Sequence, residues 1–231
     1  MSRVPVLLSW SSGKDSAWSL HTLNERDDVE VVGLLTTVNE THDRVAMHAV
    51  RRELLERQAQ AAGLSLRVVD LPWPCSNEIY EQRMGAAVEA IAAEGIRDMA
   101  FGDLYLEDIR DYRVKNLAGT GIEPQFPLWG RDTRELAEAM LEGGLRAVLT
   151  SVDPKQLPPE FVGRQYDHDL LRDLPESVDP CGENGEFHTF VYAGPMFAEP
   201  LDVRVGRIVE REGFHFADVI PADWPDDPVS D

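Results

Sequence analysis

The sequence has little cysteine and little positive charge, and each shortage excludes a class of protein. Its two cysteines, Cys75 and Cys181, are too few for a disulfide framework, and they form no CxxC or Cys/His metal motif. Twenty-two Lys and Arg face 42 Asp and Glu, which gives a net charge of −20. Nucleic acids and anionic membranes are bound by clustered positive charge, so we expect neither as a partner. Such acidity is also typical of proteins from a salt-rich cytoplasm, and the composition leaves both explanations open.

The chain also lacks a long apolar run. No stretch approaches the roughly 18 apolar residues of a membrane-spanning helix. The apolar segment at residues 4–10 is not followed by the small-residue cleavage site of a secretory signal, so we expect a cytoplasmic protein. Hydrophobic residues make up 43% of the chain and charged residues 28%, which is typical of a globular fold.

Apolar runs alternate with amphipathic stretches through the first two thirds of the chain. Runs typical of buried strands cover residues 4–10, 30–37, 66–71, 99–102 and 145–152. Helical patterns cover residues 15–24, 46–62, 77–95 and 132–143. Strands that alternate with helices predict an α/β fold, with a mainly parallel twisted sheet and helices on both of its faces.

The pattern changes after Asp153. Five prolines between residues 154 and 180 interrupt regular structure, and strand-like patterns follow at 187–192, 201–210 and 215–220. We therefore predict an α/β domain over residues 1–152, a smaller irregular α+β portion over 153–220 and an acidic tail over 221–231. An apolar hairpin in the C-terminal portion offers a surface that could pair two copies, so monomer and homodimer both stay open.

The sharpest local signal is Ser11-Ser-Gly-Lys-Asp-Ser16, between a predicted strand and a predicted helix. Hydroxyls, a flexible glycine and free helix N-terminal amides converge there with the charge of Lys14, which favours phosphate binding. The segment is not a Walker A loop, because Leu8 and Asp15 stand where that loop has glycine and Ser or Thr. Since ligands of such sheets bind beyond the carboxyl ends of the strands, an ordinary capped turn is the less favoured alternative.

A second cluster of polar residues lies at 179–190, with the sequence DPCGENGEFHTF. A plain loop gains nothing from Glu183, Asn184, Glu186 and His188 together, so their density indicates a functional site. A turn with a solvated pair of charges is the alternative.

Both segments resemble the motifs of a known family. The first resembles the S-G-G-x-D-S pyrophosphatase (PP) loop of the N-type ATP pyrophosphatases, with Ser12 where that pattern has its first glycine. The second closely resembles the C-G-E-N-G-E-[FY]-H-T motif of diphthine–ammonia ligases and their relatives. Residues 102–112 and 123–130 are also similar, so the resemblance covers about residues 5–197. It implies a fold like that of the adenine nucleotide alpha hydrolases, with an ATP-binding domain over residues 1–152 and the acceptor site in 153–220.

The resemblance implies an enzyme that uses ATP, Mg²⁺ and ammonium. In that family ATP adenylates the carboxylate of diphthine on elongation factor 2, pyrophosphate leaves, and ammonia attacks to give an amide and AMP. A carboxylate is a poor electrophile, and adenylation gives it a good leaving group. Bacteria have relatives of the family but no diphthamide. Three alternatives therefore stay open: the acceptor is elongation factor 2 diphthine, the acceptor is an unknown small carboxylate, or the chemistry is reduced to nucleotide hydrolysis.

The resemblance also assigns roles to residues. The phosphates of ATP are expected at Ser11, Ser12, Gly13, Lys14, Asp15, Ser16, Gly102 and Asp103, with Asp15 also holding Mg²⁺. The catalytic residues are expected to be Lys14 and Asp15 on the pyrophosphate side and Glu183, Glu186 and His188 on the ammonia side. There, carboxylates attract ammonium and a neutral His takes its proton. The substrate is expected to contact Asn184, Gly185, Thr189 and Trp129. For Asp103 a helix cap, and for Trp129 a structural aromatic, are equal alternatives.

Two other functions stay open. A PP-loop tRNA-modifying enzyme is disfavoured by the net charge and by the absence of a cysteine pair, and we expect Cys181 to be a buried thiol rather than a nucleophile. A non-catalytic adenine-nucleotide sensor has no use for the acidic, His-containing cluster at 183–189. His42 and His48 lie six residues apart, which is wrong for a metal pair on a helix, so we expect surface or loop positions.

Overall fold

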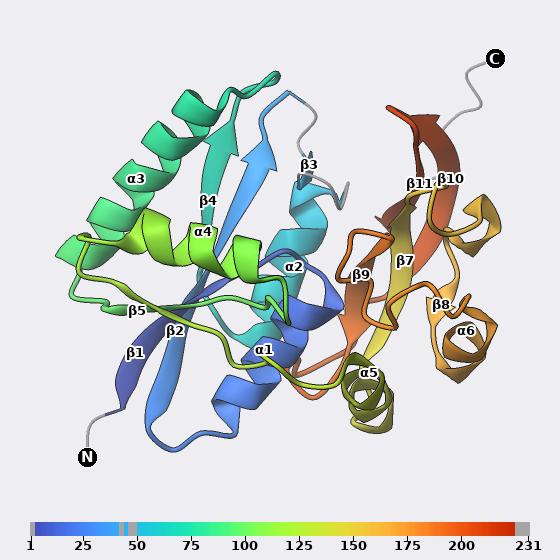
Figure 1. Cartoon of the computed structure of the whole chain (residues 1–231), viewed down its shortest axis with the longest axis horizontal. Helices are drawn as coiled ribbons and strands as arrows, with labels where there is room; N and C mark the ends of the chain where they lie inside the picture. The colour runs from blue at the N-terminus through green and yellow to red at the C-terminus, as the bar shows by residue number, and fades with distance from the viewer. Residues whose placement is uncertain (1–2, 42–43, 46–49, 225–231) are drawn as a thin grey trace.

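The structure is a computed structural model that describes residues 3–41, 44–45 and 50–224 (Figure 1). His42, His48 and the acidic tail beyond residue 224 lie outside these ranges, so the predictions made for them are not addressed. Two sheets stand next to each other, the first built from the N-terminal half of the chain and the second from the C-terminal half.

In the described part of the chain the first sheet has six strands, and five of them run parallel in the order β4–β2–β1–β5–β6. These are β1 (Val4–Ser9), β2 (Val29–Asn39), β4 (Leu66–Leu71), β5 (Asp98–Ala100) and β6 (Glu123–Gln125). The short β3 (Arg44–Val45) pairs antiparallel with the end of β2. The strand order reverses between β1 and β5, and ligands of doubly wound sheets bind beyond the carboxyl ends at such a point. The predicted α/β fold with a mainly parallel sheet is confirmed.

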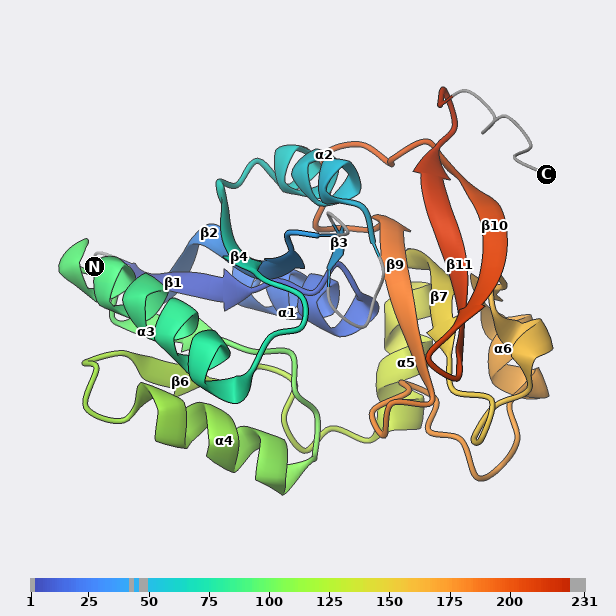
Figure 2. The same ribbon diagram turned by 90° about the horizontal axis from the view of Figure 1, so that it is seen from above.

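Helices cover both faces of this sheet (Figure 2). On one face lie α1 (Lys14–Asn24) and α2 (Arg52–Ala62), and on the other lie α3 (Asn77–Ala93) and α4 (Glu107–Leu117). The apolar run of β1 serves both faces: Val6 and Leu8 belong to the core under α1 and α2, and Leu7 belongs to the core under α3 and α4. This alternation follows from the two-residue period of a strand.

Most predicted helices are present, with two differences. The helix predicted from residue 46 begins at Arg52, and residues 46–49 lie outside the described ranges. Helix α4 was not predicted, because Leu117 is its one buried residue and its sequence has no apolar stripe. The predicted caps are confirmed at Ser76, which accepts a hydrogen bond from the Ile79 N–H, and at Asp132.

The second sheet is antiparallel. It consists of β7 (Arg146–Val152), β8 (Gln165–Tyr166), β9 (Phe187–Ala193), β10 (Val203–Arg211) and β11 (Phe214–Pro221). β7 was predicted as a strand of the parallel sheet, and that part of the prediction is wrong: it pairs with β8, β9 and β11. Six of its seven residues are buried, and such an apolar run does not reveal which sheet it joins. The predicted division of the chain at residue 152 stays a prediction.

Three helices accompany this sheet: α5 (Thr133–Glu142), a single 3₁₀ turn at Pro159–Phe161 and α6 (His168–Asp173). The two sheets share one continuous core, which runs from Leu8 and Ala17 to Phe190 and Val191. Figures 1 and 2 show β9 beside the start of α1. This packing places the motif at residues 179–190 next to the motif at residues 11–16. None of the described helices is long and apolar enough to cross a membrane.

Candidate active site

A cavity of about 270 Å³ lies where the two motifs meet at the carboxyl ends of β1 and β5. We call it the crevice. It is lined by Ser9, Ser11, Lys14, Asp15, Ser16, Phe101, Gly102, Asp103, Arg113, Cys181, Gly182, Glu183, Gly185, Phe187, His188 and Thr189. This lining therefore includes most of the residues that the sequence singled out.

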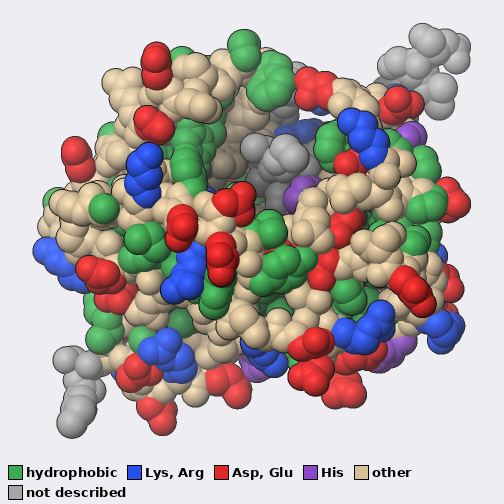
Figure 3. Space-filling model, in the orientation of Figure 1, with side chains coloured by type: hydrophobic (Ala, Val, Ile, Leu, Met, Phe, Trp, Pro, Cys, Tyr) green, Lys and Arg blue, Asp and Glu red, His purple; other side chains and the backbone are tan. Residues whose placement is uncertain are grey.

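On the outer surface, acidic side chains are spread over the visible face with basic ones between them (Figure 3).

The loop that leads into α1 has a strained residue. Ser12 has a φ of 72°, in the left-handed region that glycine adopts without cost, and it stands where the family pattern has glycine. Its side chain is fully buried, and its hydroxyl finds no hydrogen-bond partner among the described residues. Ser12 therefore adopts a glycine-like backbone conformation and is absent from the described lining of the crevice, and its predicted contact with ATP stays a prediction.

A buried glutamine fixes this loop, and the sequence analysis missed it. Gln58 of α2 donates from Nε2 to the carbonyls of Ser12 (3.1 Å) and Val191 (2.6 Å). Its Oε1 accepts a hydrogen bond from Trp10 Nε1 at 2.9 Å. The Val191 N–H also donates to the Ser12 carbonyl, at 3.0 Å. Polar residues of an amphipathic helix usually face solvent, so nothing in the sequence marks Gln58 as a bridge between the loop and β9.

The start of α1 lies against the crevice. Gly13 is the N-cap, and it has no side chain to accept the first amides of the helix, which also lack acceptors within the helix. The Lys14 N–H donates to Thr189 Oγ1 at 3.1 Å. The backbone at Gly102 lies so close to the start of α1 that a Cβ on this residue would be 3.0 Å from the Ser16 nitrogen. The predicted Gly102 is thus needed for close approach of the β5 loop to the start of α1.

Lys14 and Asp15 form an ion pair at the base of the crevice. The Lys14 ammonium lies 2.8 Å from Asp15 Oδ2 and also donates to the Cys181 carbonyl. Burial is the largest influence on Lys14 and lowers its pKa, but the charge and hydrogen bond of Asp15, together with Cys181 and Glu183, raise the pKa of Lys14 overall. Burial raises the pKa of the Asp15 carboxyl, and Lys14 opposes the rise. Lys14 therefore ties the first motif to the second, and its contact with phosphate stays a prediction.

Asp103 faces the crevice, as one of its two sequence interpretations predicted. Its partner is Arg113 of α4, whose Nε lies 3.5 Å from Asp103 Oδ2. Burial raises the pKa of the Asp103 carboxyl, and the charge of Arg113 opposes the rise. Sequence reasoning missed Arg113, because ten residues and the start of an unpredicted helix separate it from Asp103.

Glu183 has the most unusual carboxylate of the crevice. Its Oε1 accepts hydrogen bonds from the backbone N–H groups of Leu104 (2.8 Å) and Tyr105 (3.4 Å). Burial raises its pKa to about 7, despite these bonds, and the negative charge of Asp15 adds to the rise. A carboxyl that titrates near neutral pH can exchange a proton with a substrate.

The Glu186 side chain lies outside the described lining of the crevice. Its side chain is 1% exposed, and Oε1 accepts hydrogen bonds from the Asp179 N–H (2.9 Å) and Asn184 Nδ2 (3.0 Å). Within the described residues, neither Glu186 nor Asn184 lines the crevice. In this structure the two side chains bond to each other and support the turn. The catalytic role of Glu186 and the substrate contact of Asn184 stay predictions.

Asp179 organises the same turn, which the sequence analysis did not foresee. Its Oδ1 accepts from the N–H groups of Cys181 (2.8 Å) and Glu183 (3.3 Å), and its Oδ2 accepts from Thr133 Oγ1 at 2.6 Å. The turn presents Gly185 and His188 to the crevice, as predicted.

Two further predictions have different outcomes. Trp129 is absent from the described lining of the crevice, the Arg110 guanidinium lies 4.8 Å from its ring centroid, and Phe126 packs against it edge-on. This packing favours the structural alternative, and the substrate contact stays a prediction. Cys181 is buried and donates its thiol to the Thr133 carbonyl, and burial raises its pKa to about 12. The thiol is therefore protonated at neutral pH, as expected of an unreactive cysteine.

The carboxylates that line the crevice fit Mg²⁺ bound together with a nucleotide. No group of three or more His, Cys, Asp or Glu in the described residues is placed to hold a metal ion. Asp15, Asp103 and Glu183 nevertheless line the crevice, and the buried Oδ2 of Asp103 finds no hydrogen-bond partner in the described part of the chain. Mg²⁺ is usually bound through one or two carboxylates together with phosphate oxygens, and these residues fit that pattern.

Comparison with known proteins agrees with the geometry. Residues 3–119 match the family model of the diphthamide synthase N-terminal domain, and residues 132–219 match that of the diphthamide synthase C-terminal domain. The chain is 25% identical to the diphthine–ammonia ligase of Bos taurus over 242 residues, covering 94% of this chain and 88% of that protein. The Homo sapiens ligase gives the same identity and the same coverage. The Danio rerio ligase is 31% identical over 122 residues, which cover 49% of this chain and 47% of that protein. The chain therefore belongs to the diphthamide synthase family, a family of ATP-using carbon–nitrogen ligases.

Proposed function

We propose that this enzyme adenylates a carboxylate acceptor and then converts it to an amide. A carboxylate oxygen attacks the α-phosphorus of ATP, and the bond from that phosphorus to the bridging oxygen of the β-phosphate breaks, releasing pyrophosphate. Ammonia then attacks the acyl carbon, the bond to AMP breaks, and the nitrogen loses a proton. The observation that carries the proposal is the convergence of residues 11–16 and 179–189 in one crevice.

The first motif suits the pyrophosphate half of the reaction. The amides at the start of α1 and the hydroxyls of Ser11 and Ser16 converge at the crevice, where they would hold phosphate oxygens. Asp15 and Asp103 would hold Mg²⁺, which would supply positive charge next to the pyrophosphate. Lys14 keeps Asp15 in place and adds positive charge at the base of the site.

The second motif suits the ammonia half. Ammonium must lose a proton before it can attack, and the adduct must lose another. Glu183, with a pKa of about 7, is the residue we assign to this proton transfer, with His188 beside it in the crevice lining. Glu186 acts as a positioning residue that supports the turn.

The acceptor we propose is a carboxylate of the diphthine type, either on elongation factor 2 or as a small molecule, because the named relatives are diphthine–ammonia ligases. A sulfur-transferring tRNA enzyme fits the site less well, since the Cys181 thiol is buried and its pKa lies near 12. A nucleotide sensor fits less well too, since it gains nothing from a carboxyl poised to titrate near neutral pH.

Product analysis tests this proposal. The protein is incubated with Mg²⁺-ATP and ammonium, together with either diphthine-bearing elongation factor 2 or an extract of small carboxylates. We expect AMP and pyrophosphate, formed only when an acceptor is present, and no cleavage by the Asp15→Asn variant. ADP and phosphate, or tight ATP binding without cleavage under every condition, would overturn the proposal.

A further inference from the structure

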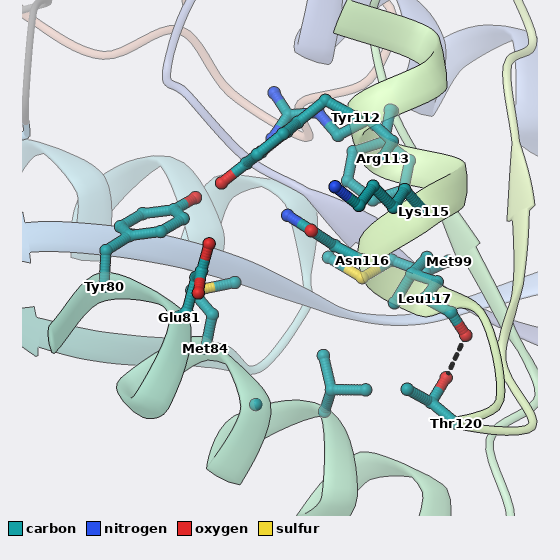
Figure 4. Close-up of a pocket in the computed structure, with 13 residues that line it drawn as sticks. Tyr80, Glu81, Met84, Met99, Tyr112, Arg113, Lys115, Asn116, Leu117 and Thr120 are labelled. Carbon is teal, nitrogen blue, oxygen red and sulfur yellow. Dashed lines mark hydrogen bonds between the residues drawn. The ribbon is translucent and has the colours of Figure 1, made fainter. Parts of the chain in front are cut away.

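A second and larger cavity, of about 440 Å³, lies between α3 and α4 on the face of the parallel sheet opposite α1 and α2 (Figure 4). We call it the α3–α4 cavity. Its volume falls within the roughly 300–1,000 Å³ of typical small-molecule sites. The steps proposed above for ATP and ammonia use none of it.

The lining of the α3–α4 cavity has an apolar floor and a polar rim. The floor includes Met84, Val88, Met99 and Leu117, and the rim includes Tyr80, Glu81, Tyr112, Arg113, Lys115 and Asn116. Figure 4 shows the hydroxyls of Tyr80 and Tyr112 turned toward each other, with Arg113 and Lys115 on the α4 side. Two basic groups and one acidic group line the cavity, and one of the basic groups, Arg113, is also paired with Asp103 on the crevice side.

The α3–α4 cavity and the crevice share part of their lining. Phe101 and Arg113 line both spaces. The Arg113 guanidinium lies 5.0 Å from the Phe101 ring centroid, and its Nε lies 3.5 Å from Asp103 on the crevice side. That Nε is buried and makes no hydrogen bond within the described residues. Arg113, whose side chain is 30% exposed and whose Nε is buried, therefore stands between the two spaces.

We infer that the α3–α4 cavity binds the body of the acceptor, an apolar group that ends in a carboxylate, and that Arg113 directs this carboxylate into the crevice. The inference rests on the proposed function, which requires an acceptor carboxylate beside the phosphates. Arginine pairs well with carboxylates, and an apolar body gains free energy on the floor of Met84, Val88 and Leu117.

Gly85 offers a way to fill the α3–α4 cavity without disturbing the fold. It lines the cavity within α3, and a Cβ placed there meets nothing within 4 Å. Replacing a helical glycine with leucine favours the helix, so Gly85→Leu should fold. Ala86→Leu is the matched control, because Ala86 is the exposed neighbour on the same helix and is absent from the described lining.

Calorimetry with phenylbutyrate tests the cavity directly. We expect phenylbutyrate to bind to the wild type and to Ala86→Leu, and to bind at least about tenfold more weakly to Gly85→Leu. Phenylbutyramide, which has the same body without the charge, should bind more weakly than phenylbutyrate. Equal affinities of the two variants for phenylbutyrate, or no binding to the wild type, would overturn the inference. So would weaker ATP binding by Gly85→Leu alone, because the cavity would then hold the nucleoside.

Steady-state kinetics separates this inference from the proposed function. With phenylbutyrate as a free acceptor and diphthine-bearing elongation factor 2 as a protein-borne one, Gly85→Leu should raise the acceptor KM at least about tenfold and leave the ATP KM unchanged. The acceptor that is turned over identifies the source. AMP formation with one acceptor KM for all three proteins would refute the cavity and leave the proposed function intact. If the wild type forms no AMP with either acceptor, the proposed function fails, and calorimetry alone decides whether the cavity binds a carboxylate.

Discussion

At the scale of single residues, Ser12 shows how a departure from a motif is accommodated. A left-handed φ of 72° costs a non-glycine residue about 1 kcal/mol or more, and the buried hydroxyl gains no hydrogen bond in return among the described residues. The strain persists because Gln58 and Val191 both bond to the Ser12 carbonyl.

Ser12→Gly should therefore stabilise the protein. We expect the free energy of unfolding to rise by about 1 kcal/mol, because glycine adopts this φ without strain. Urea denaturation measures the change. Ser12→Ala is the control, since it removes the hydroxyl and keeps the strain; a glycine variant no more stable than the alanine variant would contradict the explanation.

Glu183 should set the pH dependence of the reaction. If Glu183 accepts a proton as a general base, kcat/KM should rise with pH through an apparent pKa of about 7. Glu183→Gln should remove this dependence and lower kcat by about 100-fold or more, with ATP affinity unchanged. Steady-state rates between about pH 5 and 9 measure both effects. A wild-type profile that is flat through neutral pH would exclude the assignment.

The same pKa has a consequence for stability that serves as a control. The pKa of Glu183 is raised from 4.5 to about 7, so the folded protein keeps a proton that the unfolded chain releases between these values. Stability is therefore lost as pH rises through this window. Glu183→Gln should be at least as stable as the wild type above neutral pH, which shows that its loss of activity is not a loss of folding.

At the scale of elements, two supports position the crevice residues. Gln58 of α2 joins the 11–16 loop to β9, and removing it leaves the Trp10 N–H and the Val191 carbonyl without this partner. Gln58→Leu should lower the free energy of unfolding by about 3 kcal/mol, because buried polar groups lose their hydrogen bonds. It should also weaken ATP binding. Thermal denaturation and ATP titration are the measurements, and the exposed Gln60→Leu on the same helix, which should change neither, is the control.

The turn at 179–186 is the other support, and it separates two glutamates that the sequence treats alike. Glu186→Gln keeps an oxygen that can accept from the Asp179 N–H, so turnover should fall by less than about tenfold. The same change at Glu183 should cost about 100-fold or more. Both variants are compared at saturating ATP. An inactive Glu186→Gln that still folds and binds ATP would restore Glu186 as a catalytic residue.

At the scale of the whole molecule, the fold could be predicted further than the site. The alternation of strands and helices predicted the parallel sheet, because each period follows from local geometry. The sheet that β7 joins could not be predicted, since a run buried on both faces packs equally well in either sheet. Helix α4 was not predicted because Leu117 is its one buried residue. Arg113 of this helix was therefore missed as well, although it lines both the crevice and the α3–α4 cavity.

The motifs predicted which segments form the site, and the structure shows which of their side chains line the crevice and which bond within the turn. Asp15, Glu183, His188 and Thr189 line the crevice, and Thr189 also accepts a hydrogen bond from the Lys14 N–H. Glu186 and Asn184 bond to each other instead. A sequence motif indicates that its residues are needed together in one site. Which of them contacts a substrate and which one supports the turn depends on side-chain direction, and spacing along the chain does not give that.

The central claim is that a carboxylate, and not water, attacks the α-phosphorus of ATP. Running the reaction in water labelled with heavy oxygen tests this most directly, because the attacking oxygen ends in AMP. With an acceptor and ammonium present, the account predicts pyrophosphate and AMP without the label, as measured by mass spectrometry. Labelled AMP would show that the protein simply hydrolyses ATP, and labelled phosphate formed with ADP would show cleavage at the wrong bond; either result would contradict the account.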